Sequence, residues 1–248
     1  MRVLVVTAVA AERDAVCGAG EAYASRALPG GYELRRAPDG SPAPDVLAAG
    51  VGPAAASAGT ATALTAAALA GEPYGLVVSA GIGGGFAPAA PLGSVVVADA
   101  IVAADLGAET PDGFVPVTEL GFGTVAHRPD PALVRAVAAA SGATAGPVVT
   151  VSTVTGSAAR AAELAARHPG VLAEAMEGFG VAEAAAAHGR PVLEIRTVSN
   201  AVGPRDRAAW RIGPALAALT GAFRTFPEAL TAAAGPAPGP APSPRRTP

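Results

Sequence analysis

Two glutamates stand at positions where a carboxylate can take part in chemistry. The first, Glu12, lies in the segment AVAAERDAV, just past an apolar run and at the start of an expected helix. Open α/β sheets bind ligands at the carboxyl ends of their strands, and a carboxylate placed there can act as a general base. A glutamate in the first turn of a helix, favoured by the helix dipole, is the alternative interpretation.

The second glutamate, Glu177, follows Met176 and precedes Gly178 in the segment AEAMEGFGV. We expect a strand-to-helix junction at this point. A carboxylate at a helix start can bind a vicinal diol, because two hydroxyls donate to its two oxygens. A solvated or capping glutamate is the alternative.

A cluster of polar residues closes the apolar segment PVLEIRTVSN, where Arg196, Ser199 and Asn200 follow one another closely. Polar groups gathered at the end of an apolar strand are difficult to explain as core. Their placement therefore favours a functional role.

A glycine-rich segment, SAGIGGGFAP, contains Gly81, Gly83, Gly84 and Gly85 after the apolar run GLVV. A dinucleotide-binding fingerprint would follow the first strand and open a helix, whereas here another strand-like run, APLGSVVV, comes next. That excludes a Rossmann site. Backbone amides that approach a ligand closely remain one interpretation, and a tight turn between strands is the other.

Strand-like and helix-like segments alternate along the chain, which predicts an α/β layered fold with a largely parallel central sheet. Residues 30–45 are expected to form a hairpin excursion around YELRR. We expect strands at 3–9, 76–78, 95–97, 148–151 and 192–195, and helices at about 53–70, 131–140, 157–168, 177–188 and 214–232.

The composition excludes several classes of function. All 17 cationic residues are arginine, so chemistry that needs a lysine is excluded. The net charge of −3 and the aromatic fraction of 4% argue against nucleic-acid binding. No apolar span reaches membrane length, and the three histidines are too far apart for a metal site. One cysteine, Cys17, is consistent with a reducing cytoplasm, where we expect the protein to be.

We expect a single catalytic domain over residues 1–234. The remaining residues, 235–248, read GPAPGPAPSPRRTP, and this proline-rich composition predicts a disordered tail.

Taken together, these segments resemble the nucleoside phosphorylase and nucleosidase superfamily, in particular the methylthioadenosine/adenosylhomocysteine nucleosidases and the related futalosine hydrolases. The resemblance runs from Met1 to about Leu230. Its marks, in order, are Glu12 after the first strand, GVGPAAASAGTATAL at 50–64, the glycines at 81–85, VSTVTGS at 151–157, AMEG at 175–178 and RTVSN at 196–200. The stretch VGPRDRAAW, which ends at Trp210, is more similar to the futalosine hydrolases. The resemblance implies one three-layer αβα domain with a mixed central sheet.

The resemblance also implies roles for the residues in a reaction that cleaves the bond between a purine and ribose. Glu12 would take a proton from water, with Arg196 orienting that water or the glutamate, and Glu177 would bind the ribose hydroxyls. The remaining implied contacts are Met176 under the sugar, Gly81, Ile82 and Gly83 around base and ribose, Thr153, Val154 and Trp210 over the base, Asn200 donating to N7 of the base, and Ser199 beside it. No cofactor and no metal is implied, and relatives are commonly dimers or larger.

The chain departs from the nucleosidase pattern at two positions, of which the second bears directly on the substrate. Ile82 stands where that branch usually has serine, and Asn200 stands where it has aspartate. An asparagine amide can donate to both acceptors of hypoxanthine, N7 and O6, which favours hydrolysis of futalosine in menaquinone biosynthesis. An adenine nucleosidase acting on methylthioadenosine, adenosylhomocysteine or aminodeoxyfutalosine is one alternative. The others are a phosphorylase, disfavoured because AVAAERD replaces the superfamily's early glycine-plus-arginine loop, and a non-catalytic binding module.

Overall fold

The structure, a computed structural model, describes residues 1–18 and 22–234. The predicted tail at 235–248 therefore lies outside the described residues.

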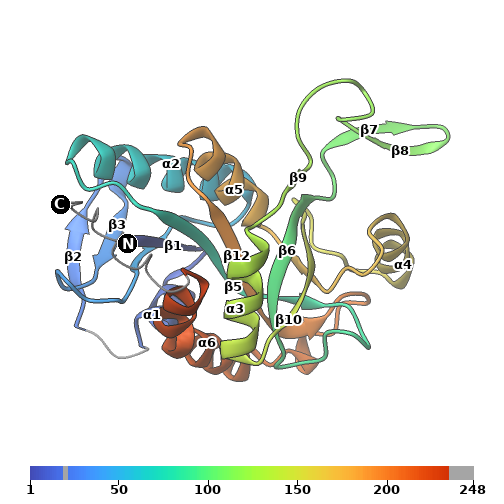
Figure 1. Cartoon of the computed structure of the whole chain (residues 1–248). Helices are drawn as coiled ribbons and strands as arrows, with labels where there is room; N and C mark the ends of the chain where they lie inside the picture. The colour runs from blue at the N-terminus through green and yellow to red at the C-terminus, as the bar shows by residue number, and fades with distance from the viewer. Residues whose placement is uncertain (19–21, 235–248) are drawn as a thin grey trace, which may run out of the picture.

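Within the described residues, ten strands form one mixed sheet (Figure 1). The expected strands are all present, and several are longer than the apolar runs that predicted them. They are β1 (Val3–Thr7), β2 (Ala24–Ala27), β3 (Glu33–Arg36), β4 (Asp45–Ala48), β5 (Leu76–Gly85), β6 (Val95–Ala103), β9 (Ala126–His127), β10 (Thr144–Thr150), β11 (Ala173–Ala175) and β12 (Val192–Ala201). The order across the sheet is β11-β10-β6-β12-β5-β1-β4-β3-β2, with β9 paired to β6.

The centre of the sheet is closed on itself. β5 pairs with β1 and β12 in parallel, β12 runs antiparallel to β6, and β11 pairs with both β10 and β5. The glycine-rich segment differs from the interpretation as a tight turn between strands. Residues 81–85 are not a loop but the second half of β5, because they pair with β12 on one side and, at Gly84 and Gly85, with β11 on the other.

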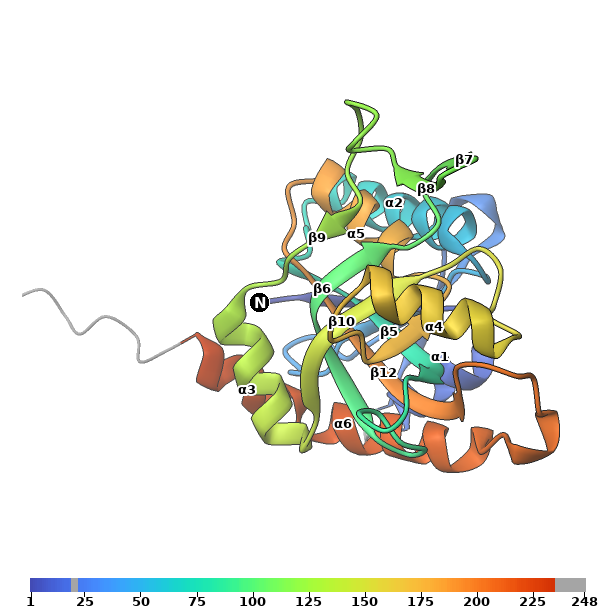
Figure 2. The same cartoon turned by 90° about the vertical axis from the view of Figure 1, so that its right-hand side faces the viewer.

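Helices cover both faces of the sheet, as the three-layer prediction requires. α2 (Pro53–Leu69) and α5 (Gly178–Ala187) pack together on one face, and α1 (Ala10–Cys17), α3 (Pro131–Ser141) and α6 (Ile212–Ala233) on the other (Figure 1). α4 (Ala158–Arg167) lies at the side of the sheet beyond β10 (Figure 2). The hairpin of β7 (Gly107–Thr110) and β8 (Gly113–Pro116) projects from the body.

Side chains on alternate positions of β12 enter the two apolar layers in turn. Val192 and Val198 belong to the core under α2 and α5, whereas Leu193 and Ile195 belong to the core under α3 and α6. This period-2 alternation is what a strand buried on both faces must show. It also means that the polar residues at 194 and 196 lie on the α5 side.

Helix starts follow local capping rules. Asp130 accepts a hydrogen bond from the Ala132 amide at 2.7 Å, and Ser157 accepts one from the Arg160 amide at 3.2 Å. Each satisfies an amide that has no partner within its own helix. None of the helices in the described part of the chain is long and apolar enough to span a membrane.

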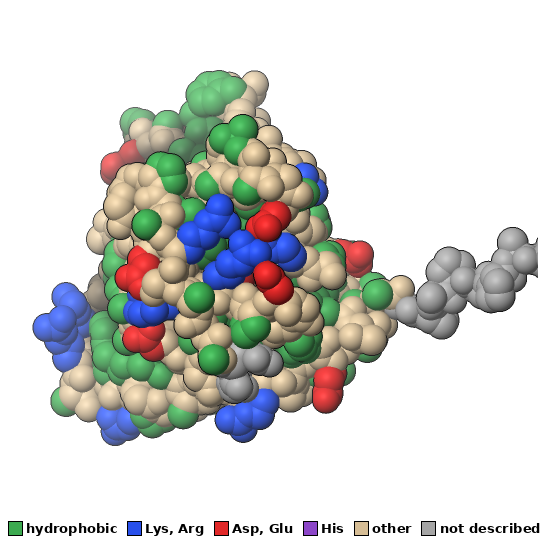
Figure 3. Space-filling model, turned by 90° about the vertical axis from the view of Figure 1, so that its left-hand side faces the viewer, with side chains coloured by type: hydrophobic (Ala, Val, Ile, Leu, Met, Phe, Trp, Pro, Cys, Tyr) green, Lys and Arg blue, Asp and Glu red, His purple; other side chains and the backbone are tan. Residues whose placement is uncertain are grey.

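Strands β2 to β4 form the hairpin excursion expected around YELRR, and ion pairs hold it to the rest of the sheet. The buried carboxylate of Asp45 accepts from Arg2 Nη2 at 2.6 Å, Tyr74 Oη at 2.7 Å and the Ala37 amide at 2.9 Å. Acidic and basic side chains interleave on this face of the molecule (Figure 3). Asp45 therefore joins three segments that are far apart in the sequence.

We expect Asp45→Ala to lower the free energy of unfolding by roughly 2 kcal/mol, because it leaves the buried Tyr74 hydroxyl and Nη2 of Arg2 without their carboxylate acceptor. Chemical denaturation measures the change. The control is Asp39→Ala, which removes an exposed carboxylate paired with Arg36 and is expected to change stability by less than about 0.5 kcal/mol. Equal effects of the two substitutions would contradict the role given to Asp45.

Candidate active site

A cleft of about 300 Å³ opens at the carboxyl ends of β1, β5 and β12, where the topology predicts a site. Segments that are distant in the sequence meet there. The lining residues are Ala8, Val9, Glu12, Val51, Ile82, Gly83, Gly84, Val154, Glu174, Ala175, Met176, Glu177, Ser199, Asn200 and Trp210.

Glu12 is held in the cleft by backbone amides. It is the third residue of α1, and its Oε2 accepts from the amides of Ala8 at 3.0 Å and Val9 at 3.3 Å. Its Oε1 accepts from the amide of Ile82 at 2.9 Å. Since a carboxylate oxygen has about two acceptor positions, Oε2 is filled and Oε1 keeps one free. The carboxylate is thus fixed in orientation and can still accept a proton.

Glu177 is fixed in the same way from two other elements. Its Oε1 accepts from the amide of Gly52, just before α2, at 3.2 Å, and its Oε2 accepts from the amide of Met176 at 3.3 Å. The side chain is 7% exposed and borders the cleft. The remaining lone pairs can accept from two hydroxyls of a ligand.

Arg196 lies behind the two carboxylates and is wholly buried. Its Nη1 is 3.2 Å from Glu177 Oε2, and its Nη2 donates to Ser79 Oγ at 2.9 Å. Its Nε donates to Glu194 Oε1 at 2.8 Å. Arg196 does not border the cleft itself, so its influence on a ligand must pass through Glu12, Glu177 or a group that enters between them.

The absence of a side chain at Gly81 makes this arrangement possible. Gly81 pairs directly with Arg196 across β5 and β12. A Cβ on Gly81 would lie 2.5 Å from Glu12 Oε1 and 2.8 Å from Arg196 Nη1, closer than any real contact. The glycine lets the carboxylate and the guanidinium meet over the same point of the strand.

Burial shifts the protonation of the acidic groups. Desolvation raises the pKa of Glu12, against the lowering effects of Arg196 and the Ile82 amide, and the nearby Glu177 carboxylate raises it further. Desolvation likewise raises the pKa of Glu194, with Arg196 opposing it. Burial by itself would lower the pKa of Arg196, but the carboxylates of Glu194, Glu177 and Glu12 together raise it. The guanidinium is therefore a permanent cation, and Glu12 is a stronger base than an exposed glutamate.

The orientation of the Asn200 amide is determined by its neighbours. The atom 3.1 Å from the Ala201 carbonyl must be Nδ2, because a carbonyl oxygen cannot donate to another carbonyl. Oδ1 therefore faces the Ser199 hydroxyl, which donates to it at 2.9 Å. One N–H of the amide remains without an intramolecular partner, so Asn200 presents a donor.

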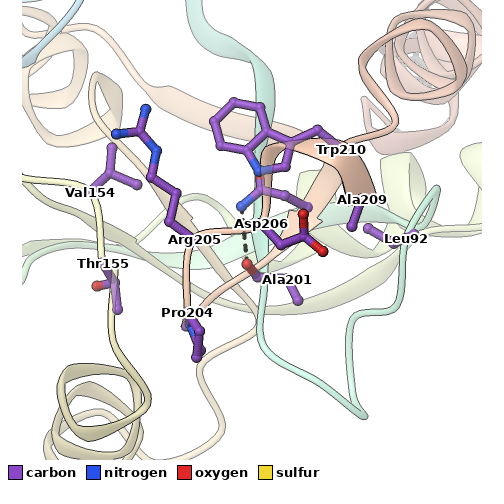
Figure 4. A pocket seen from close by; sticks show the side chains of 11 residues that line it. Leu92, Val154, Thr155, Ala201, Pro204, Arg205, Asp206, Ala209 and Trp210 are labelled. Atoms are coloured by element: carbon purple, nitrogen blue, oxygen red, sulfur yellow. Dashed lines mark hydrogen bonds between the residues drawn. The ribbon is translucent and has the colours of Figure 1, made fainter.

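A smaller pocket of about 100 Å³ continues from the cleft past Asn200 (Figure 4). Val154, Asn200 and Trp210 border both spaces. The pocket is also bordered by Arg205, whose side chain adds further hydrogen-bond donors. Asp206 borders the same pocket and offers a carboxylate acceptor beside the donors of Asn200 and Arg205.

Glu174 and Thr155 form a buried pair that sequence reasoning missed. Glu174 Oε1 accepts from the Thr155 amide at 2.9 Å, and the Thr155 hydroxyl donates to Glu174 Oε2. Burial raises the pKa of Glu174, opposed by these two hydrogen bonds. The pair anchors the segment that carries Val154 to β11.

The structure brings most of the predicted site residues to this one cleft. Gly81 and Arg196 lie behind its wall, and Thr153 is exposed and does not border it. Glu194 and Ser79 were not predicted. Glu194 could have been found from its position two residues before Arg196 in VLEIR, because alternate residues of a strand lie on the same face.

Across the residues that the structure describes, there is no group of three His, Cys, Asp or Glu side chains that could hold a metal ion. The groups present can take a proton from water through Glu12, hold a diol through Glu177, and donate to an acceptor through Asn200. These three capabilities are arranged around one cavity.

Comparison with known proteins gives consistent results. Residues 32–223 match the family model of the phosphorylase superfamily. The chain is 71% identical over 222 residues to a futalosine hydrolase of Streptomyces coelicolor, covering 90% of this chain and 93% of the relative. It is 47% identical over 225 residues to a futalosine hydrolase of Acidothermus cellulolyticus, covering 89% and 88% of the two chains.

Among solved structures, the fold matches a 5′-methylthioadenosine/S-adenosylhomocysteine nucleosidase from Colwellia psychrerythraea in complex with adenine. The TM-score is 0.78, the identity is 21%, and the match covers 93% of this chain and 96% of that one. At this identity the likeness establishes the fold.

Proposed function

The chain belongs to the phosphorylase superfamily and, within it, to the futalosine hydrolases, and we propose on this basis that it hydrolyses the N-glycosidic bond of futalosine. The products are hypoxanthine and dehypoxanthine futalosine, in the pathway to menaquinone. The enzyme is an N-glycosyl hydrolase.

The position of the Glu12 carboxylate is the observation that supports hydrolysis over phosphorolysis. Amides at the start of a helix form a ready site for an anion such as phosphate. Here Glu12 Oε2 accepts from the amides of Ala8 and Val9, at the start of α1. A phosphate at this place would lose these donors and meet a like charge.

In the proposed reaction, water attacks the anomeric carbon while the bond from that carbon to the purine nitrogen breaks. Glu12 Oε1, the oxygen with a free acceptor position, takes the proton of the water. Positive charge develops on the sugar and negative charge on the base, so both must be stabilised. The carboxylates of Glu12 and Glu177 support the first requirement, with Glu177 accepting from the ribose hydroxyls and Met176 beside the sugar.

The base side of the site supports a 6-oxopurine. Hypoxanthine presents acceptors at both N7 and O6, whereas adenine presents an acceptor at N7 beside a donor at N6. Asn200 offers one free N–H, and Arg205 borders the adjoining pocket with donors of its own. Donors on this side stabilise a leaving anion whose charge spreads onto O6. Val154 and Trp210, which border both spaces, enclose the ring.

We also propose a cytoplasmic location, which the single cysteine supports. We further propose an assembly of two or more subunits, because members of the superfamily are commonly dimers or larger. Size-exclusion chromatography with light scattering tests the assembly.

Incubation of the purified enzyme with futalosine, with and without phosphate and with a chelator, tests the proposed reaction directly. We expect equal rates in all three conditions, with free hypoxanthine and the free sugar product. A sugar 1-phosphate as product, or a rate that depends on phosphate, would contradict hydrolysis.

Glu12→Gln preserves the shape of the side chain and removes its basicity. We expect kcat to fall by about 100-fold or more with little change in KM, because the loss acts on proton transfer. Steady-state kinetics measures this. The matched control is Glu163→Gln on α4, whose side chain forms an exposed ion pair with Arg160 and does not border the cleft, and which should retain parental kinetics. Turnover within a fewfold of the parent would make Glu12 a structural residue.

Asn200→Asp tests the base preference. The parent enzyme is expected to favour futalosine over adenine nucleosides by about tenfold or more in kcat/KM, a difference of about 1.4 kcal/mol. The aspartate should narrow or reverse that preference, since an ionised carboxylate repels O6 and a protonated one can serve adenine. Equal or better kcat/KM of the parent on methylthioadenosine would overturn the assignment of the base and leave hydrolysis in place.

A further inference from the structure

Glu194 is a buried acid for which the reaction described above has no use. It is 0% exposed and does not border the cleft, so a substrate cannot contact it. A carboxylate in such a place carries a large desolvation cost unless it is paired. We propose that Glu194 is a positioning residue that holds Arg196 in place and balances its charge beside Glu12 and Glu177. This inference rests on the proposed function.

The first step of the argument is the way the guanidinium is held. Glu194 and Arg196 lie two residues apart on one face of β12, and Ser79 of β5 lies directly across from Glu194. Arg196 Nε donates a hydrogen bond to Glu194 Oε1 at 2.8 Å, and Arg196 Nη2 donates one to Ser79 Oγ at 2.9 Å. Two of the three nitrogens are thus fixed from behind, and Nη1 alone is left to face the cleft side.

The second step concerns Nη1. It is buried and has no hydrogen-bond partner within the protein, although it lies 3.2 Å from Glu177 Oε2. A Cβ on Gly81 would approach both Nη1 and Glu12 Oε1 within 2.8 Å, so these two atoms face each other over the glycine. The anchored guanidinium therefore presents the two unpaired N–H groups of Nη1 toward the place where Glu12 meets its water.

The third step is the space reserved for Glu194. A Cβ on Gly178, the first residue of α5, would lie 2.3 Å from both carboxylate oxygens of Glu194. The carboxylate consequently lies against the first turn of α5, where the helix dipole favours negative charge. Because Glu177 immediately precedes this turn, Glu194 ties Arg196 to the element that carries the ribose-binding group.

The fourth step is the balance of charge. The charged groups that face Arg196 are Glu12 from α1, Glu177 at the start of α5 and Glu194 on β12 itself. Arg196 lowers the pKa of Glu12, whereas burial raises it. Neutralising Glu194 would leave more of the positive charge of Arg196 to act on Glu12. Glu12 would then become a weaker base, and the pH below which it is protonated would fall.

Glu194→Gln tests the proposal, because glutamine keeps an oxygen for Arg196 Nε and loses only the charge. We expect the acid limb of the pH profile of kcat/KM to move down by about one unit, and kcat at neutral pH to fall about three- to tenfold. Glu163→Gln, an exposed glutamate in an ion pair, is the matched control and should leave both unchanged. An unmoved acid limb in a folded Glu194→Gln enzyme would overturn the proposal, whatever its thermal stability.

Two further variants separate position from charge. Ser79→Ala removes one anchor of Arg196 without changing any charge, so kcat should fall while the acid limb stays in place. If Glu194→Gln does not fold, Glu194→Asp tests the positioning role instead, because it keeps the charge on a shorter side chain. We expect the acid limb of the pH profile to stay in place and kcat to fall at least about fivefold. Parental kcat in Glu194→Asp would overturn the positioning role.

The profiles are recorded on whichever purine nucleoside the parent enzyme hydrolyses. Failure of futalosine as a substrate would therefore count against the proposed function alone. A change in the acid limb would still report on Glu194.

Discussion

A single buried guanidinium, shared by three carboxylates, is the constraint on which the rest of the site depends. Arg196 is wholly enclosed, and a cation in that position is tolerated only when carboxylates lie close enough to offset its charge. Glu194 and Ser79 accept hydrogen bonds from it on the side away from the cleft. The carboxylates of Glu177 and Glu12 lie near it on the cleft side. Gly81 and Gly178 are glycines because these polar groups occupy the space of their side chains.

The topology of the sheet makes this convergence possible. β5 lies between β1 and β12, so the end of β1, with Glu12 just beyond it, comes beside the strand that carries Arg196. β11 pairs with the end of β5, which brings Met176 and Glu177 to the same point. The reacting groups therefore come from four segments spread over nearly the whole chain, and rigid strands and helix starts set their positions.

The sequence predicted the fold class from local patterns and indicated candidate site residues at the ends of apolar runs, whereas most of the roles expected for these residues came from the resemblance to the nucleosidases. Apolar runs of the right length predicted the strands, and charged residues directly after them marked Glu12, Glu177 and the polar cluster at Asn200. What it could not predict depends on pairing between distant segments. A tight turn was one interpretation of the glycine-rich stretch, but the stretch is strand, because β11 and β12 pair with it.

The orientation of individual side chains could not be predicted from the sequence either. The donor that Asn200 presents follows from the carbonyl of Ala201 and the hydroxyl of Ser199, whose positions only the folded chain defines. Thr153 and Val154 were both expected over the base, but only Val154 borders the cleft. Glu194 was hidden within an apolar strand, where its partners could not be recognised before the strand order was known.

The central claim is that burial keeps Glu12 basic in spite of the neighbouring guanidinium, and its direct test is the titration of that one carboxyl group. Carbon-13 NMR of enzyme labelled at the glutamate carboxyl carbons, with the Glu12 resonance assigned by its absence in Glu12→Gln, measures its pKa. The account predicts a value clearly above the ordinary glutamate value of about 4.3, because desolvation outweighs the opposing effect of Arg196. A value at or below the ordinary one would contradict it.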